Sequence, residues 1–232
     1  MSVRACIFDV FGTLVDWRGG IAATVREVLG PRDGIEPEAL ADAWRAEYQP
    51  GMARVREGAR GYVPLDVLHL ENLDRVLGRL GVGLTEAERH ALNAGWSALP
   101  PWPDTAAGLA AIRAQVPVAA CSNGSIAMMI GIARAGGLVW DAILGAEIAR
   151  TYKPEPKVYR AAAEALGLPP AQVMMVAAHN DDLHAARAAG LATGFFPRRT
   201  EHGPGQATDL AAEADWDIVA PDIAGLARAL SA

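Results

Sequence analysis

The sequence predicts an α/β fold, in which a Rossmann-like parallel-sheet core is interrupted by an inserted helical domain. After residue 100, short apolar runs alternate with helical segments, which is typical of right-handed βαβ units. Between residues 16 and 99, apolar residues recur at helical spacing and nothing alternates as a strand does. We therefore predict a core domain formed by residues 1–15 and 100–232, with residues 16–99 as the helical insert.

The first predicted element is a short buried strand over residues 5–8, which ends at Asp9 and the turn of Gly12 and Thr13. Within the insert, residues 38–45 and 65–73 carry the clearest helical spacing of apolar side chains. Residues 99–104 contain three prolines, a composition typical of a domain boundary.

Beyond that boundary, four further apolar runs are predicted as strands, over residues 116–121, 173–178, 192–196 and 216–219. Residues 159–166 are predicted as a helix that stops at Gly167. A short apolar segment at Ile143 and Leu144 precedes a polar cluster at residues 152–154.

Composition excludes several classes of function. The formal charge of −6 and the lack of a Lys/Arg cluster argue against a nucleic-acid partner. No apolar run approaches the roughly 20 residues that span a bilayer, and the N-terminus does not resemble a signal peptide. Cys6 and Cys121 lie inside apolar runs, so we interpret them as reduced core thiols of a cytoplasmic protein that does not associate with membranes.

Polar residues gather where the predicted strands end. Asp9 follows the first strand, Ser122 and Asn123 follow the second, and residues 179–182 follow a third. Lys153 and Pro154 follow the apolar segment at residues 143–144. Because parallel sheets place ligands beyond the carboxyl ends of their strands, we expect one site here. A lone Asp in this position is more often a helix cap or turn residue, and only the whole set of polar residues indicates a site.

The string Phe8-Asp9-Val10-Phe11-Gly12-Thr13-Leu14-Val15-Asp16 resembles the first motif of the haloacid dehalogenase superfamily. Ser122-Asn123 resembles its second motif, Lys153-Pro154 its third, and the acidic segment ending at Asp182 its fourth. The resemblance covers the chain from end to end in the expected order. It implies that Asp9 is a covalent nucleophile and that residues 16–99 form the cap domain of that superfamily.

The reaction type needs a separate argument, because most of the superfamily are phosphatases. Their second Asp, two places after the nucleophile, is here Phe11, which cannot exchange a proton. The first acid of their fourth motif is here Ala178, which leaves Asp9 and Asp182 as a poor oxygen set for Mg²⁺ unless Asp181 substitutes. Both differences agree with the 2-haloacid dehalogenase branch, which has an aromatic residue at the Phe11 position and uses no metal or cofactor.

The resemblance to this branch assigns roles at the halide side of the site. Trp44-Arg45 resembles its Trp-Arg pair, whose arginine takes up the departing halide. Asn123 and the edge of the Phe11 ring would complete that pocket. Without the resemblance, Arg45 is a solvated arginine on a helix face.

Other residues are expected at the carboxylate and lysine side. Ser122, Thr13 and backbone N–H groups suit the carboxylate of the substrate. Lys153 would keep Asp9 ionised, and Asp182 would fix Lys153. Tyr159 belongs to a segment that resembles the lysine and tyrosine segment of the branch.

The fourth motif departs from better-known members, which carry Ser and Asn where this chain has Ala177 and His179. The string from Ala177 to Leu183 resembles a subgroup with His-Asn, so His179 and Asn180 are predicted as catalytic residues at the hydrolytic water. His179 would act as base or only position the water, and the alternative is a loop histidine bonded to backbone.

The predicted function is hydrolysis of short 2-haloalkanoic acids to 2-hydroxy acids through an ester on Asp9. Three alternatives stay open: a phosphatase or phosphonatase-like enzyme, another hydrolase of this fold, and a catalytically silent binding protein. A homodimer is expected from the family alone.

Overall fold

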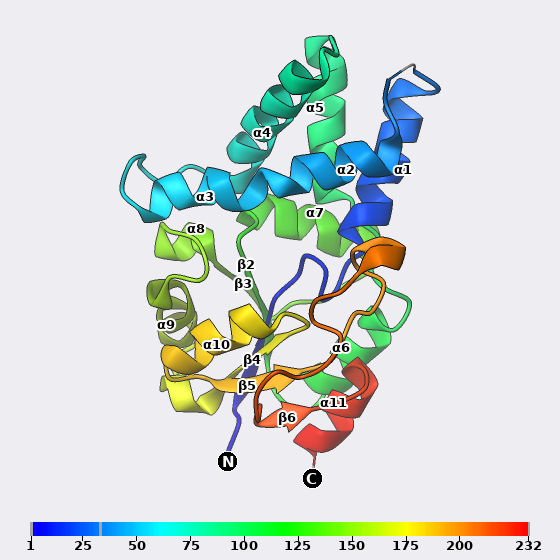
Figure 1. The fold of residues 1–232 in the computed structure, drawn as a ribbon. Coiled ribbons are helices and arrows are strands. Elements are labelled where there is room, and N and C mark those ends of the chain that lie inside the picture. Colours follow the sequence, from blue (N-terminus) through cyan, green and yellow to red (C-terminus); the bar gives the residue numbers. More distant parts are fainter. Residues whose placement is uncertain (1, 33, 232) are drawn as a thin grey trace.

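Six parallel strands form one sheet in the computed structural model, which describes residues 2–32 and 34–231 (Figure 1). The order across the sheet is β3-β2-β1-β4-β5-β6, so the first strand of the chain lies in the middle. The predicted α/β class with a parallel sheet is confirmed. The strands are β1 (Ala5–Phe8), β2 (Val118–Ser122), β3 (Ala142–Gly145), β4 (Val173–Ala177), β5 (Ala192–Phe195) and β6 (Ile218–Val219).

The predicted strands agree with β1, β2, β4 and β5 to within two residues at each end. β2 begins at Val118 because the preceding Pro117 has no N–H to donate into the ladder. β6 is shorter than predicted, since Trp216 turns into the core and its indole N–H bonds to Asn180. β3 at the sheet edge contains the Ile143-Leu144 segment, which the sequence marked only as apolar.

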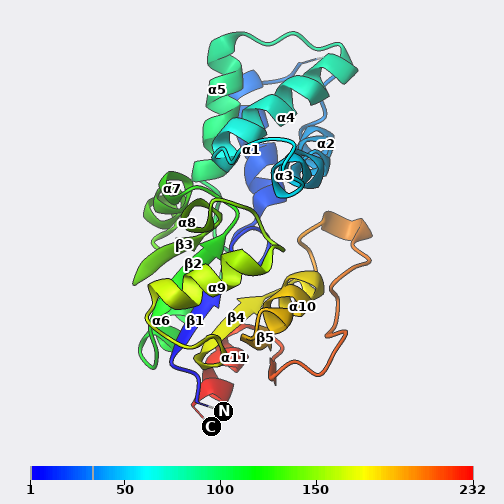
Figure 2. The ribbon, with the colours of Figure 1, turned by 90° about the vertical axis from the view of Figure 1, so that its left-hand side faces the viewer.

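Successive side chains of β1 enter two different cores, as the alternation of a strand requires. Cys6 and Phe8 belong to one cluster with side chains of α6 (Thr105–Arg113), α7 (Ile126–Gly136) and α11 (Ile223–Leu230). Ile7 belongs to the other, with side chains of α9 (Pro156–Ala165) and α10 (Asn180–Ala188). The short α8 (Ala146–Ala149) joins β3 to the segment that carries Lys153. Helices therefore cover both faces of the sheet (Figures 1 and 2).

The insert is helical throughout residues 17–32 and 34–97, apart from its connecting turns. It lies at the end of the molecule opposite the two chain termini (Figure 1). The two predicted helices are confirmed, and the second continues to Leu80 before Gly81 ends it in the left-handed region. The elements are α1 (Trp17–Leu29), α2 (Pro37–Ala46), α3 (Tyr48–Arg56), α4 (Leu65–Leu80), α5 (Glu86–Ala94) and the 3₁₀ turn η1 (Gly95–Ser97).

The two connections between insert and core run side by side. The Asp16 N–H donates to the Pro100 carbonyl at 2.9 Å, and the Trp102 N–H donates to the Leu14 carbonyl at 3.0 Å. The division into a core of residues 1–15 and 100–232 and a cap of residues 16–99 stays a prediction. These bonds place its two boundaries next to each other.

Both cysteines are free and buried in the sheet, as predicted for core thiols. Burial raises the pKa of Cys6 and of Cys121 to about 12. Across residues 2–32 and 34–231, none of the helices has the length and apolar character needed to cross a membrane.

Candidate active site

Asp9 directly follows β1, and a backbone hydrogen bond fixes its position at the end of the strand. Its N–H donates to the Val176 carbonyl of the neighbouring strand at 3.0 Å, so the backbone is fixed where the sheet ends. The side chain is 9% exposed. A carboxylate this buried needs partners for its oxygens, because charge in a low-dielectric environment is costly.

Three side chains supply those partners. Lys153 Nζ lies 2.8 Å from Oδ1 of Asp9. On the other oxygen, Thr13 donates its hydroxyl to Oδ2 at 2.8 Å, and His179 Nδ1 lies 3.2 Å from Oδ2. Thr13 is held in turn by the Ala178 N–H, which donates to its hydroxyl at 3.0 Å. The carboxylate therefore has a defined orientation.

Lys153 bridges two buried acids. Its ammonium lies 2.6 Å from Oδ2 of Asp182, and the Tyr159 hydroxyl donates a hydrogen bond to the other oxygen of Asp182. The Lys153 N–H donates to Oδ1 of Asn123 at 2.8 Å. This bond fixes the orientation of the Asn123 carboxamide and leaves its NH₂ group as a donor for a ligand.

Burial and charge act in opposite directions on these groups. Burial alone would raise the pKa of Asp9, but the charges and hydrogen bonds of Lys153 and His179 overcome it and hold that pKa well below its usual range. Burial would lower the pKa of Lys153, and the charges of Asp182 and Asp9 raise it instead. The pKa of Asp182 is raised, mainly by burial. Asp9 is therefore an ionised carboxylate beside a charged lysine at neutral pH.

Glu201 is a fifth charged member of the site, and the sequence motifs did not predict it. It is 1% exposed, and its Oε2 lies 2.8 Å from Nε2 of His179. Burial would lower the pKa of His179, but the charges of Glu201 and Asp9 raise it well above the ordinary value. Glu201 lies in an irregular segment between β5 and β6 with no motif around it, so no local pattern marks it in the sequence.

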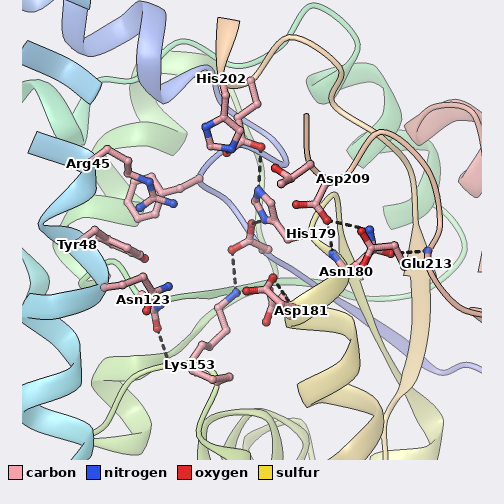
Figure 3. A pocket seen from close by; sticks show the side chains of 17 residues that line it. Arg45, Tyr48, Asn123, Lys153, His179, Asn180, Asp181, His202, Asp209 and Glu213 are labelled. Carbon is pink, nitrogen blue, oxygen red and sulfur yellow. Dashed lines mark hydrogen bonds and ion pairs between the residues drawn. The ribbon is translucent and has the colours of Figure 1, made fainter. Parts of the chain in front are cut away.

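A cavity of about 420 Å³ opens above this cluster (Figure 3). Its walls come from both parts of the chain, since Arg45 and Tyr48 of the helical insert face Asn123, Lys153 and His179 of the core. Other members of the wall are Asp9, Phe11, Gln49, Pro154, Asn180, Asp181, Asp182, Glu201, His202, Thr208, Asp209 and Glu213.

Arg45 enters the cavity from the helical side. Its guanidinium carbon lies 3.8 Å from the centroid of the Tyr48 ring, which it stacks upon, and 5.4 Å from that of Trp17. In the part of the chain that the structure describes, buried Nη1 of Arg45 has no hydrogen-bond partner. The ring of Phe11 lies edge-on to Trp96, with 5.9 Å between ring centroids. This region combines an apolar wall with an available cation.

Three predicted binding residues are buried beside the cavity and do not line it. Thr13 bonds to the nucleophile candidate, and Tyr159 bonds to Asp182. The hydroxyl of Ser122 accepts the Gly124 N–H at 3.0 Å and so fixes the turn after β2. All three are fully enclosed side chains, which suits residues that hold others in place.

Asn180 lines the cavity, but its carboxamide is committed elsewhere. Its NH₂ group donates to Asp209 Oδ1 and to the Ala211 carbonyl. Its oxygen accepts the N–H of Glu213 and the indole N–H of Trp216. Four bonds saturate the side chain, so Asn180 ties the segment of residues 209–216 to the start of α10.

A family model described as a haloacid dehalogenase-like hydrolase matches residues 3–190. This chain belongs to the haloacid dehalogenase-like hydrolases. Among curated relatives of this hydrolase, (S)-2-haloacid dehalogenase 4A of Burkholderia cepacia is 31% identical over 195 residues, which are 83% of this chain and 82% of the relative.

Two solved structures resemble this hydrolase over nearly its whole length. The L-2-haloacid dehalogenase PA0810 has a TM-score of 0.95 and 46% identity, with 99% of each chain covered. The defluorinating L-2-haloacid dehalogenase Rha0230 also has a TM-score of 0.95, with 48% identity over 99% of this chain and 96% of the other.

The site can support nucleophilic chemistry by a carboxylate. The hydrolase has an ionised Asp9, a charged lysine, a histidine–glutamate pair and Arg45, whose Nη1 has no hydrogen-bond partner among the described residues, around one cavity. In residues 2–32 and 34–231, no group of three or more His, Cys, Asp or Glu side chains is arranged to hold a metal ion.

Proposed function

We propose that this hydrolase converts short 2-haloalkanoic acids to 2-hydroxy acids, with Asp9 as the covalent nucleophile. The observation that carries the proposal is the ionised, buried Asp9 facing Arg45 across the cavity, with Phe11 at the position of the phosphatase acid. The relative (S)-2-haloacid dehalogenase 4A and the two L-2-haloacid dehalogenase structures that resemble this chain support the same reaction.

In the first step, Asp9 attacks the carbon that bears the halogen, the carbon–halogen bond breaks, and an ester forms. A carboxylate has about four lone-pair positions. Thr13 and His179 both contact Oδ2, whereas Oδ1 contacts only Lys153 among the side chains described. Oδ1 therefore keeps a lone pair for the attack, and it becomes the ester oxygen. In-line displacement inverts the configuration of the carbon.

Arg45 is proposed to receive the departing halide. Its unpaired Nη1 and the NH₂ group of Asn123 are donors, and the Phe11 ring edge adds a weakly positive wall. The carboxylate of the substrate is proposed to bind backbone N–H groups after β1 and β2, in turns that Thr13 and Ser122 fix.

In the second step, water attacks the Asp9 carbonyl carbon and releases the 2-hydroxy acid. His179 is proposed to act on this water, and Asn180 to hold the neighbouring segment in place. Lys153 and Asp182 keep the regenerated carboxylate ionised, and Tyr159 supports Asp182. The proposed cap closes the cavity against bulk water.

The substrate panel tests this function directly. Halide release is measured from both enantiomers of 2-chloropropionate, from chloroacetate and from fluoroacetate, and p-nitrophenol release from its phosphate ester with Mg²⁺. We expect halide from the chlorinated acids with preference for the (S) enantiomer, as the names of the relatives suggest. Phosphate ester hydrolysis without halide release would favour a phosphatase, and inactivity on both would favour another hydrolase or a binding protein.

Two further parts of the proposal concern the setting of the enzyme. Two buried free thiols and the charge of −6 suit a cytoplasmic enzyme of small acids without nucleic-acid partners. A homodimer is proposed from the family resemblance, and the mass of the enzyme in solution tests it.

A further inference from the structure

Glu201 occupies a site built to hold it. The segment of residues 200–205, orange in Figure 1, reaches from the core to the base of α1. There the indole N–H of Trp17 donates to Oε1 of Glu201 at 2.9 Å. A Cβ atom on Gly12 would lie 2.0 Å from the same oxygen, so only glycine leaves room for this carboxylate. Trp17 and Gly12 thus both accommodate the buried carboxylate of Glu201.

The other oxygen of Glu201 connects it to the reacting centre. Oε2 lies 2.8 Å from Nε2 of His179, and Nδ1 of the same ring lies 3.2 Å from Oδ2 of Asp9. The ring stands between the two carboxylates, with its two nitrogens facing opposite partners (Figure 3). A carboxylate on one nitrogen fixes the tautomer of a histidine and frees its other nitrogen to exchange a proton.

We propose that Glu201 is a positioning residue that makes His179 the base for hydrolysis of the Asp9 ester. The inference rests on the proposed dehalogenase function and adds Glu201, Trp17 and Gly12 to its machinery. It assigns the pair to the second step alone, because His179 does not face Oδ1, the proposed attacking oxygen.

The charge on Asp9 decides when the base is available. Before reaction His179 is an imidazolium between the carboxylates of Asp9 and Glu201. Two other basic groups face these carboxylates: Lys153 contacts Oδ1 of Asp9, and Nε2 of His202 lies 3.6 Å from Oε1 of Glu201. Ester formation removes the charge of Asp9. His179 then releases its Nδ1 proton to solvent through the cavity that it lines. The other proton stays on Nε2, which donates it in a hydrogen bond to Glu201.

The hydrolytic step then balances in atoms and protons. Water attacks Cγ of Asp9 while Nδ1 takes one of its protons, and the negative charge on Oδ2 accepts a hydrogen bond from Thr13. The bond between Cγ and Oδ1 breaks, and the leaving alkoxide takes a proton from Nζ of Lys153, which lies 2.8 Å from Oδ1. The new carboxylic acid passes its proton to Nζ, and because Nδ1 keeps the proton taken from water, the starting charges are restored. Each turnover releases one halide and one proton.

Rapid-quench kinetics of Glu201→Gln with excess (S)-2-chloropropionate test the inference. Halide release is followed together with the mass of the tryptic peptide that contains Asp9. We expect ester formation within about threefold of wild type and hydrolysis slowed on the order of 100-fold. The variant should show a burst of one chloride per site and accumulate the ester. The matched control Glu164→Gln, on the exposed face of α9, should behave as wild type.

Trp17→Phe is the second variant, and it decides the matter if Glu201→Gln does not fold. It removes the donor to Oε1 of Glu201 and keeps an aromatic ring. Hydrolysis of the ester should therefore slow more than ester formation, and by a smaller factor than in Glu201→Gln. Equal slowing of both steps, or slow turnover without accumulated ester, would overturn the role of Glu201. A wild-type enzyme that releases no halide would instead overturn the proposed function.

Discussion

Lys153→Met removes the one cation that lies between Asp9 and Asp182 while keeping an unbranched side chain of similar length. Nζ lies 2.8 Å from one carboxylate and 2.6 Å from the other, and all three side chains are less than a tenth exposed. Removing one partner of a buried ion pair costs about 3–5 kcal/mol, because the remaining charge stays desolvated. We expect the free energy of unfolding at neutral pH to fall by about this amount.

The loss should depend on pH in a defined direction. In wild type the pKa of Asp9 is lowered, so this group adds stability above the unfolded pKa of about 3.9, and that stability is lost as pH falls through the folded pKa. Without Lys153, burial at Asp9 is opposed by His179 but no longer by the lysine, and at Asp182 the lowering effect of Lys153 is lost, so the pKa values of both acids rise. The deficit of the variant should therefore grow with pH, by up to about 1.4 kcal/mol per pH unit for each proton involved.

Urea unfolding followed by circular dichroism measures this deficit near pH 5 and near pH 8. Lys157→Met, an exposed lysine on α9, is the matched control and should be close to wild type at both values. Turnover of Lys153→Met should be low at neutral pH and recover partly as pH rises and Asp9 ionises. A deficit below about 1 kcal/mol that does not change with pH would show that Lys153 does not act as a buried ion-pair partner, because an exposed ion pair contributes no more than this.

Three further substitutions test individual contacts. Asp9→Asn should abolish turnover and leave the fold intact, since a carboxamide of nearly the same size is a poor nucleophile; residual activity above a few per cent, with deamidation excluded by mass, would contradict it. Arg45→Lys should fail in halide release nearly as badly as Arg45→Ala, because an ammonium replaces neither the planar donor fork nor its stacking on Tyr48; near-normal kinetics of the lysine variant would return Arg45 to a surface charge. Asn180→Ala should lower the free energy of unfolding by at least about 2 kcal/mol, since it leaves partners in residues 209–216 without their bonds; a smaller loss in a urea titration would mean that water replaces the carboxamide.

The sequence predicted the parts of the site that follow strands. Asp9 and Ser122 stand where buried parallel strands end, and the polar end of such a strand is visible as a change of composition. Lys153 was found by its motif, and its ammonium lies between Asp9 and Asp182 in the structure. These positions depend on local patterns that a single chain displays.

Contacts between segments distant in sequence were not accessible in this way. Glu201 lies in an irregular segment, and its partners Trp17 and His179 are distant along the chain. Asn180 was predicted at the hydrolytic water from its neighbour His179, whereas its bonds reach forward to residues 209–216. A residue's type gives its capacity for bonds, but the folded path of the chain decides which partners use it.

The central claim, that Asp9 forms an ester with the substrate, is tested most directly by a single turnover in ¹⁸O-labelled water with enzyme in excess over (S)-2-chloropropionate. If Oδ1 of Asp9 attacks carbon, the oxygen delivered to the first product molecule comes from the protein. We predict largely unlabelled 2-hydroxy acid and one ¹⁸O atom on the peptide that contains Asp9. Labelled product together with an unlabelled Asp9 peptide would show direct attack of water and contradict the account, even with dehalogenation confirmed.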